Sequence, residues 1–166
     1  MTIPRTIMDA IQLVKCIGMR YLWVDSLCIV QNNDDDKRQQ ITFMDSIYIS
    51  AELLIVAAAG SDANAGLPGT GSTARSVSQT IRKITRAQFI TAQPSVQQVL
   101  DRSVWNRRGW TFQETVLSRR ALVFSESLVY WSCQADTWRE DIGSESPVAG
   151  LKLNETNSPL ELYLRL

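Results

Sequence analysis

Histidine is absent from this chain, and its absence removes several common kinds of catalytic site. Without it, neither a Ser-His-Asp triad nor a Cys-His pair can activate a nucleophile, and the HExxH zinc motif cannot form. The sequence also contains no CxxC pair and no GxxxxGKS or GxxxxGKT phosphate-binding loop. We therefore expect no metal site and no bound cofactor. Any chemistry must rest on carboxylates, arginines, hydroxyls and backbone amides.

Cysteine is scarce and the charges cancel. Cys16, Cys28 and Cys133 are odd in number and widely spaced, which argues against a disulfide framework and favours a reducing compartment such as the cytoplasm. Seventeen basic residues balance seventeen acidic ones, so no net field draws the chain to nucleic acid or an anionic membrane. No apolar run is long enough for a membrane span, and the start, MTIPRTIMDA, lacks the apolar stretch of a signal peptide. We expect one cytoplasmic domain.

The first sixty residues alternate between helical and strand-like patterns. Residues 4–17 carry apolar side chains at near-helical spacing and end before Gly18. The short apolar run YLWVD then predicts a buried strand. A helix is expected to begin at the acidic residues 34–36, with an apolar stripe from Ile41 to Ala51, and LLIVAAA predicts a second buried strand. This order predicts an α/β domain with a layered parallel sheet flanked by helices.

Less regular patterns follow. Residues 60–76 are rich in small residues and contain a GxGxxA pattern, but this pattern lies too far after the strand for a dinucleotide-binding turn, which favours a loop. Residues 77–100 fit either strand or helix. ALVFS and LVYWSC predict two strands around a turn at Glu126 and Ser127. From residue 141 the chain becomes polar, which predicts a tail or linker over 141–166.

Three segments resemble the fungal heterokaryon incompatibility (HET) domain family. They are RYLWVDSLCIVQNNDDD, MDSIYISAELLIVAAAG with AGLPG, and VWNRRGWTFQETVLSRRALVF. The resemblance covers roughly residues 3–140, so we assign residues 1–140 to a HET domain. The family's opening strand, an aromatic-Ser-Tyr-x-Trp-Gly segment, is absent. We therefore expect a domain incomplete at its N-terminus, prone to self-association through the exposed sheet edge.

The resemblance implies a role in the cell death that follows fusion of genetically different fungal individuals. HET domains have also been proposed to be distantly similar to TIR domains, some of which cleave NAD, so a TIR-like sheet is expected. Trp110 and Glu114 have the spacing of the Trp-x-x-x-Glu helix that carries the catalytic glutamate of those enzymes. NAD is accordingly the candidate substrate of a NAD glycohydrolase. The alternative function is a non-enzymatic protein-interaction module that triggers death by assembly.

The stretch WNRRGWTFQE admits two interpretations. In the catalytic one, Trp110 stacks on a flat ring, Glu114 stabilises the positive charge that develops on a ribose carbon, and Arg107 and Arg108 bind phosphates. In the structural one, the aromatic residues belong to the core and Glu114 pairs with Arg107 or Arg108 at its edge. Asp25 likewise either contacts a ribose hydroxyl or caps the following turn.

Overall fold

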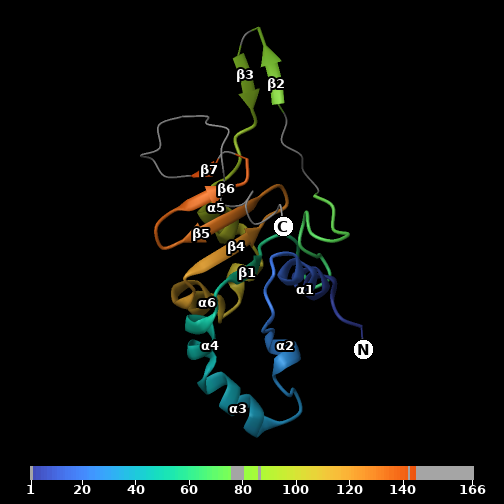
Figure 1. The fold of residues 1–166 in the computed structure, drawn as a ribbon, viewed down its shortest axis with the longest axis vertical. Coiled ribbons are helices and arrows are strands. Elements are labelled where there is room, and N and C mark those ends of the chain that lie inside the picture. The colour runs from blue at the N-terminus through green and yellow to red at the C-terminus, as the bar shows by residue number, and fades with distance from the viewer. Residues whose placement is uncertain (1, 76–80, 86, 142, 145–166) are drawn as a thin grey trace.

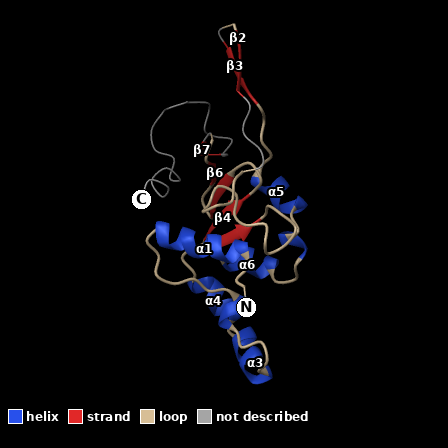
Figure 2. Ribbon diagram, turned by 90° about the vertical axis from the view of Figure 1, so that its right-hand side faces the viewer, coloured by secondary structure: helices blue, strands red, loops and turns tan. Residues whose placement is uncertain are grey.

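The computed structural model describes the chain except for residues 1, 76–80, 86, 142 and 145–166 (Figure 1). Its helices are α1 (Arg5–Cys16), α2 (Asp25–Cys28), α3 (Asp34–Thr42), α4 (Met44–Ser50), α5 (Val96–Arg102), the 3-10 turn η1 (Trp105–Arg107) and α6 (Thr111–Leu117). Its strands are β1 (Leu54–Ala57), β2 (Ile81–Ile84), β3 (Ala87–Ile90), β4 (Arg120–Phe124), β5 (Val129–Cys133), β6 (Thr137–Arg139) and β7 (Gly143–Ser144). In both ribbon views the hairpin β2–β3 projects from one end of the molecule and α3 lies at the other (Figures 1 and 2).

The main sheet is mixed, so the fold is α/β but the prediction of a parallel sheet is wrong. Among the described residues its strand order is β1-β4-β5-β6-β7. Only β1 and β4 run parallel, whereas the β4–β5, β5–β6 and β6–β7 pairs are antiparallel. The chain reverses over a few residues after β4 and again after β5, and such short connections can join only antiparallel neighbours. The two strands and the turn predicted around Glu126 and Ser127 are confirmed as β4 and β5.

Helices cover both faces of this sheet. Along β4, Leu122 and Phe124 pack with α1 in one apolar cluster, whereas Val123 belongs to a second cluster on the opposite face. The second cluster contains Trp105 and is closed by apolar side chains of α5. The alternation follows from the two-residue period of a strand. Because Trp105 is buried there, the segment that carries the candidate site is anchored directly to the sheet.

The strand predicted for YLWVD does not form. Residues 19–24 belong to no strand, Tyr21 is exposed, and Asp25 already begins α2. The backbone of Val24 is extended, but among the described residues β1 pairs only with β4. Residues 19–24 are therefore an extended connection and not a strand of the sheet. β1 is thus an edge strand of the described sheet. The proposed loss of an opening strand stays a prediction.

The helix predicted from residue 34 is two helices. Asn33 caps α3 by accepting from the amides of Asp35 and Asp36, as the polar start of this segment suggests. The helix ends before Phe43, and α4 then carries the buried Met44 and Tyr48. α3 has no buried residue, so the buried side chains of the stripe predicted from residue 41 begin only at Met44, on a helix that packs against α6. Helix α1 and its end at Gly18, which has a φ of 74°, agree with the prediction.

Residues 60–75 form a loop, as predicted, and α1 holds it in place. The buried carboxylate of Asp9 accepts from the Leu67 amide at 2.9 Å and from the Thr73 hydroxyl. Gly66 has a φ of 82°, and a β-carbon there would meet the Asp9 carboxylate at 2.7 Å, so this close approach requires glycine. The close packing of this loop against α1 therefore accounts for its glycine, and a cofactor-binding turn is not needed to explain it.

The tail predicted for residues 141–166 lies mostly outside the described residues and stays a prediction. Its first residue, Asp141, forms a bidentate ion pair with Arg139 at 2.9 and 2.6 Å, and both side chains are largely buried. Asp141 is therefore part of the folded structure.

Candidate functional site

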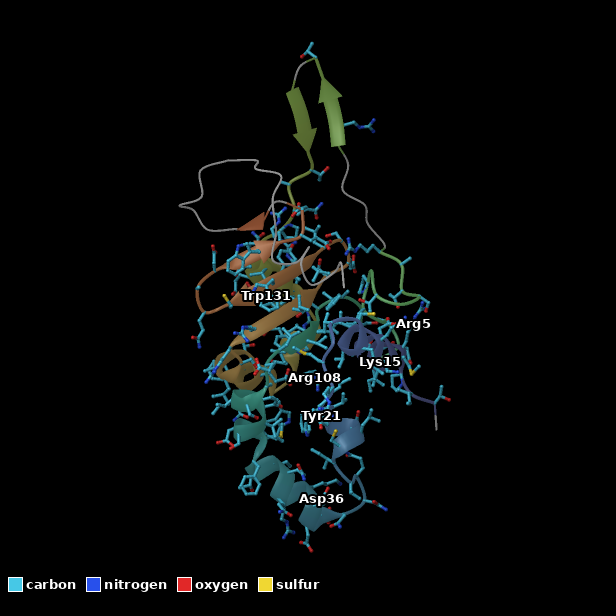
Figure 3. All side chains as sticks on the ribbon, in the orientation of Figure 1. Arg5, Lys15, Tyr21, Asp36, Arg108 and Trp131 are labelled. Carbon is cyan, nitrogen blue, oxygen red and sulfur yellow. The ribbon has the colours of Figure 1, made fainter. Side chains whose placement is uncertain are left out.

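Three short elements bring the candidate residues together. Asp25 is the first residue of α2, Arg108 lies between η1 and α6, and Glu114 lies in the middle of α6. Helix α4 packs against α6 and supplies Tyr48. Figure 3 shows the labelled Arg108 between the α4–α6 pair and the chain segment that leads into α2. Residues distant in the sequence thus meet at one place.

Asp25 and Arg108 form an ion pair. Their closest charged atoms, Oδ2 and Nη2, are 3.8 Å apart, and the side chains are 48% and 52% exposed. The other oxygen, Oδ1, accepts from the Ser26 amide at 2.7 Å, so Asp25 also orders the first turn of α2. Solvent reaches both partners, and such pairs contribute about 0–1 kcal/mol to stability. The pair therefore positions the two groups more than it stabilises the fold.

Glu114 is half-buried and its pKa is raised above the ordinary 4.5. Burial is the main cause, because it disfavours the charged form. The Arg108 guanidinium and the Trp105 side chain, which can donate its indole N–H, oppose the rise, and the Asp25 carboxylate adds to it. Within the described part of the chain, Glu114 makes no ion pair within 4.0 Å. The ion pair of the structural interpretation, between Glu114 and Arg107 or Arg108, is not formed.

Trp110 and Arg107 lie at the edge of this group. The helical spacing expected for Trp110 and Glu114 is present, since the Glu114 amide donates to the Trp110 carbonyl at 3.1 Å. Trp110 is exposed just before α6, where its indole is accessible to a flat ring. Arg107 is exposed at the end of η1 and takes part in none of the ion pairs among the described residues. The structure therefore brings Asp25, Arg108 and Glu114 together, whereas Trp110 and Arg107 are neighbours of Arg108 along the chain.

Tyr48 and Trp23 belong to the same neighbourhood, although the sequence assigned Tyr48 only to the apolar stripe of a helix. Their rings meet edge to face, with centroids 6.1 Å apart. Burial, with the nearby carboxylates of Glu114 and Asp25, raises the pKa of Tyr48 to about 12, and Arg108 opposes this rise. A tyrosine within a helical stripe carries no signal that distinguishes it from core, so only the tertiary structure could identify it.

The described residues contain no group of three or more His, Cys, Asp or Glu side chains arranged to hold a metal ion. None of the described helices combines the length and the apolar character that crossing a membrane requires.

Comparison with known proteins agrees with the resemblance of the three segments. The family model for heterokaryon incompatibility protein (HET) matches residues 1–114, which is more than half of the chain and ends at Glu114. No curated protein and no solved structure matches the chain. On the strength of the family match, the chain belongs to the heterokaryon incompatibility family, and this membership implies a role in heterokaryon incompatibility.

Proposed function

We propose that this chain is a cell-death effector of fungal heterokaryon incompatibility that cleaves NAD at the bond between nicotinamide and ribose, with Glu114 as its catalytic residue. The observation that carries the proposal is the convergence of Glu114 with Asp25 and Arg108 from separate elements. A carboxylate that is half-buried and not neutralised by a direct ion pair is available to a developing positive charge.

The reaction needs only groups that this site contains. As the glycosidic bond breaks, neutral nicotinamide leaves with the bonding electron pair and positive charge develops on the ribose carbon. The ionised Glu114 carboxylate stabilises that charge. Water then adds to the same carbon and releases a proton, so NAD and water become nicotinamide, ADP-ribose and a proton.

The remaining candidates have distinct roles in this proposal. Trp110 offers an accessible indole on which a flat ring can stack. Arg108 is already paired with Asp25, so Arg107 is the guanidinium available for the two phosphates. Asp25 keeps an accessible carboxylate that can accept from a ribose hydroxyl. The spacing of Trp110 and Glu114, which matches the Trp-x-x-x-Glu helix of NAD-cleaving TIR domains, supports this arrangement.

The test is NAD consumption by the purified full chain, measured as nicotinamide release by chromatography. Wild type and Glu114→Gln are compared with Glu52→Gln, the same chemical change at an exposed acid that pairs with Arg120 at 3.1 Å. We expect release by wild type and by the Glu52 variant and its loss in the Glu114 variant. Equal release by all three proteins would refute the assignment of Glu114.

A second function, a protein-interaction module that triggers death by assembly, is favoured by the outer face of α6. Phe112 and Val116 lie one turn apart and are 74% and 61% exposed. Apolar side chains that adjoin one another on an exposed face are typical of contact surfaces, whereas single exposed ones are common on any protein. If assembly is the function, the double variant Phe112→Ser with Val116→Ser should lose killing in cells, Glu114→Gln should retain it, and Met8→Ser, a change at an exposed residue of α1, should have no effect.

A further inference from the structure

Two elements at opposite ends of the molecule have little packing of their own. The hairpin β2–β3 forms a separate two-stranded sheet, and in both ribbon views it projects from one end (Figures 1 and 2). Helix α3 lies at the other end and has no buried residue. A two-stranded hairpin is at best marginally stable in water, and so is a lone helix of nine residues. Contact with a partner would therefore stabilise both elements.

The hairpin is basic. Residues 81–90 contain three basic residues and no acidic one, although the charges of the whole chain cancel. Arg82 in β2 is exposed and takes part in none of the ion pairs among the described residues. A sheet buries apolar side chains only against another layer, and the same ten residues include Ile81, Ile84, Phe89 and Ile90. This composition suits a partner surface that is both acidic and apolar.

Residues 27–45, which we call the acidic end, have the complementary composition. They contain four acidic residues and two basic ones. The Asp34 side chain is 83% exposed, Asp35 is also exposed, and Lys37 pairs with Asp34 only at 3.9 Å. Several large apolar side chains of this segment are exposed as well, namely those of Leu27, Val30, Ile41 and Phe43. The acidic end therefore offers both carboxylates and apolar side chains to a partner.

These two surfaces cannot meet within one copy of the chain, because they lie at opposite ends of the same folded molecule (Figures 1 and 2). A second copy presents both surfaces. Since the charges of the chain cancel, the copies do not repel one another through net charge. Opposite charges at the two surfaces would favour the encounter and fix its orientation, and removal of apolar side chains from water would stabilise the contact.

We propose that the hairpin β2–β3 of one copy binds the acidic end of a second copy, with Arg82 and Lys83 facing the acidic start of α3. The contact does not involve Glu114, so it is independent of NAD cleavage. It also differs from assembly through Phe112 and Val116 on the outer face of α6.

The first experiment is sedimentation velocity of the full chain over a range of concentrations at low and high salt. Wild type is compared with the double variant Arg82→Glu with Lys83→Glu. The control is Lys15→Glu with Arg20→Glu, the same reversal of charge at two other exposed basic residues. We expect wild type and the control to associate equally and more weakly at high salt. The hairpin variant should associate about tenfold more weakly or less, because like charges then oppose one another.

The second experiment reverses the other surface and then mixes the two kinds of protein. Asp34→Lys with Asp35→Lys should also weaken self-association. In an equal mixture of the two reversed variants, each altered surface meets a surface of opposite charge on the other protein. We therefore expect the mixture to associate about as strongly as wild type. Because misfolded variants could not restore one another in this way, the mixture separates a contact role from a folding defect.

Four outcomes would overturn this inference. The first is a wild type that stays monomeric at every concentration. The second is self-association that persists in both reversed variants, which would place the contact on another surface, such as the edge of β1. The third is a mixture that remains as dissociated as its components. The fourth is binding of wild type to phosphatidylserine vesicles without self-association, which would make an anionic membrane the partner of the hairpin.

Discussion

Replacing Glu114 by glutamine distinguishes a catalytic from a structural role, because the change keeps the shape of the side chain and removes its charge. The carboxylate is half-buried, its pKa is raised mainly by burial, and it makes no ion pair within 4.0 Å among the described residues. These features predict a large loss of activity with little change in stability.

The structure indicates how much stability and how much catalytic rate the Glu114→Gln variant should lose. If Glu114 were half of a buried ion pair, its neutralisation would cost about 3–5 kcal/mol by leaving a charge unpaired. Arg108, however, is 52% exposed and already pairs with Asp25, so the loss should stay below about 1 kcal/mol. Removing a group that stabilises transition-state charge costs about a hundredfold in rate, or roughly 3 kcal/mol in the barrier.

The sign of the pH dependence provides a further check. A raised pKa means that the folded protein binds the proton more tightly than the unfolded chain. The free energy of unfolding should therefore fall as pH rises from 4.5 through the raised pKa of Glu114. In Glu114→Gln the contribution of this carboxyl group to the pH dependence should be absent, so its stability should fall less over this range than that of wild type. Activity should follow the ionised form and decline as pH falls through a value above 4.5.

The assays are nicotinamide release, killing in cells at matched protein levels, and urea unfolding at several pH values. Normal killing and normal release by Glu114→Gln would refute the catalytic role. A loss of stability of about 3 kcal/mol or more in that variant would instead show that the carboxylate is a buried structural partner.

Three further predictions concern stability. The pKa of Tyr48 is about 12 in the folded protein and 10.0 ordinarily, so the unfolded chain loses this proton first and the free energy of unfolding should fall as pH rises from 10 to 12. Urea unfolding at several alkaline pH values should show a weaker fall in Tyr48→Phe than in wild type. The same fall with pH in both proteins would contradict this prediction. Leu67→Ala should cost about 2–5 kcal/mol in urea unfolding, because Leu67 is fully buried; a cost under about 1 kcal/mol would mean that the loop on α1 opens readily. Asp141→Ala should cost about 3 kcal/mol by removing the carboxylate that forms the bidentate ion pair with the largely buried Arg139, and a neutral effect would place residue 141 in the tail.

Short-range patterns in the sequence were enough to predict several elements. Apolar spacing and the terminal glycine predicted α1, small residues predicted the loop over 60–75, and short apolar runs predicted β1, β4 and β5. Each of these signals depends on residues a few positions apart. The helical placement of Glu114 one turn after Trp110 was predictable for the same reason.

Long-range pairing was not predictable in this way. An apolar run such as YLWVD has the composition of a strand, but it forms one only if another backbone supplies a ladder, and the described pairing of β1 is with β4 alone. The mixed direction of the sheet likewise depends on where each strand finds its partner.

The sequence by itself therefore determined the family, the α/β class and the residues that carry charge near α6. Only the tertiary structure decided that Arg108 pairs with Asp25 and that Tyr48 shares their environment. The physical reason is that helix and turn formation depend on neighbouring residues, whereas the packing of α4 against α6 and the approach of α2 to Arg108 depend on the whole fold.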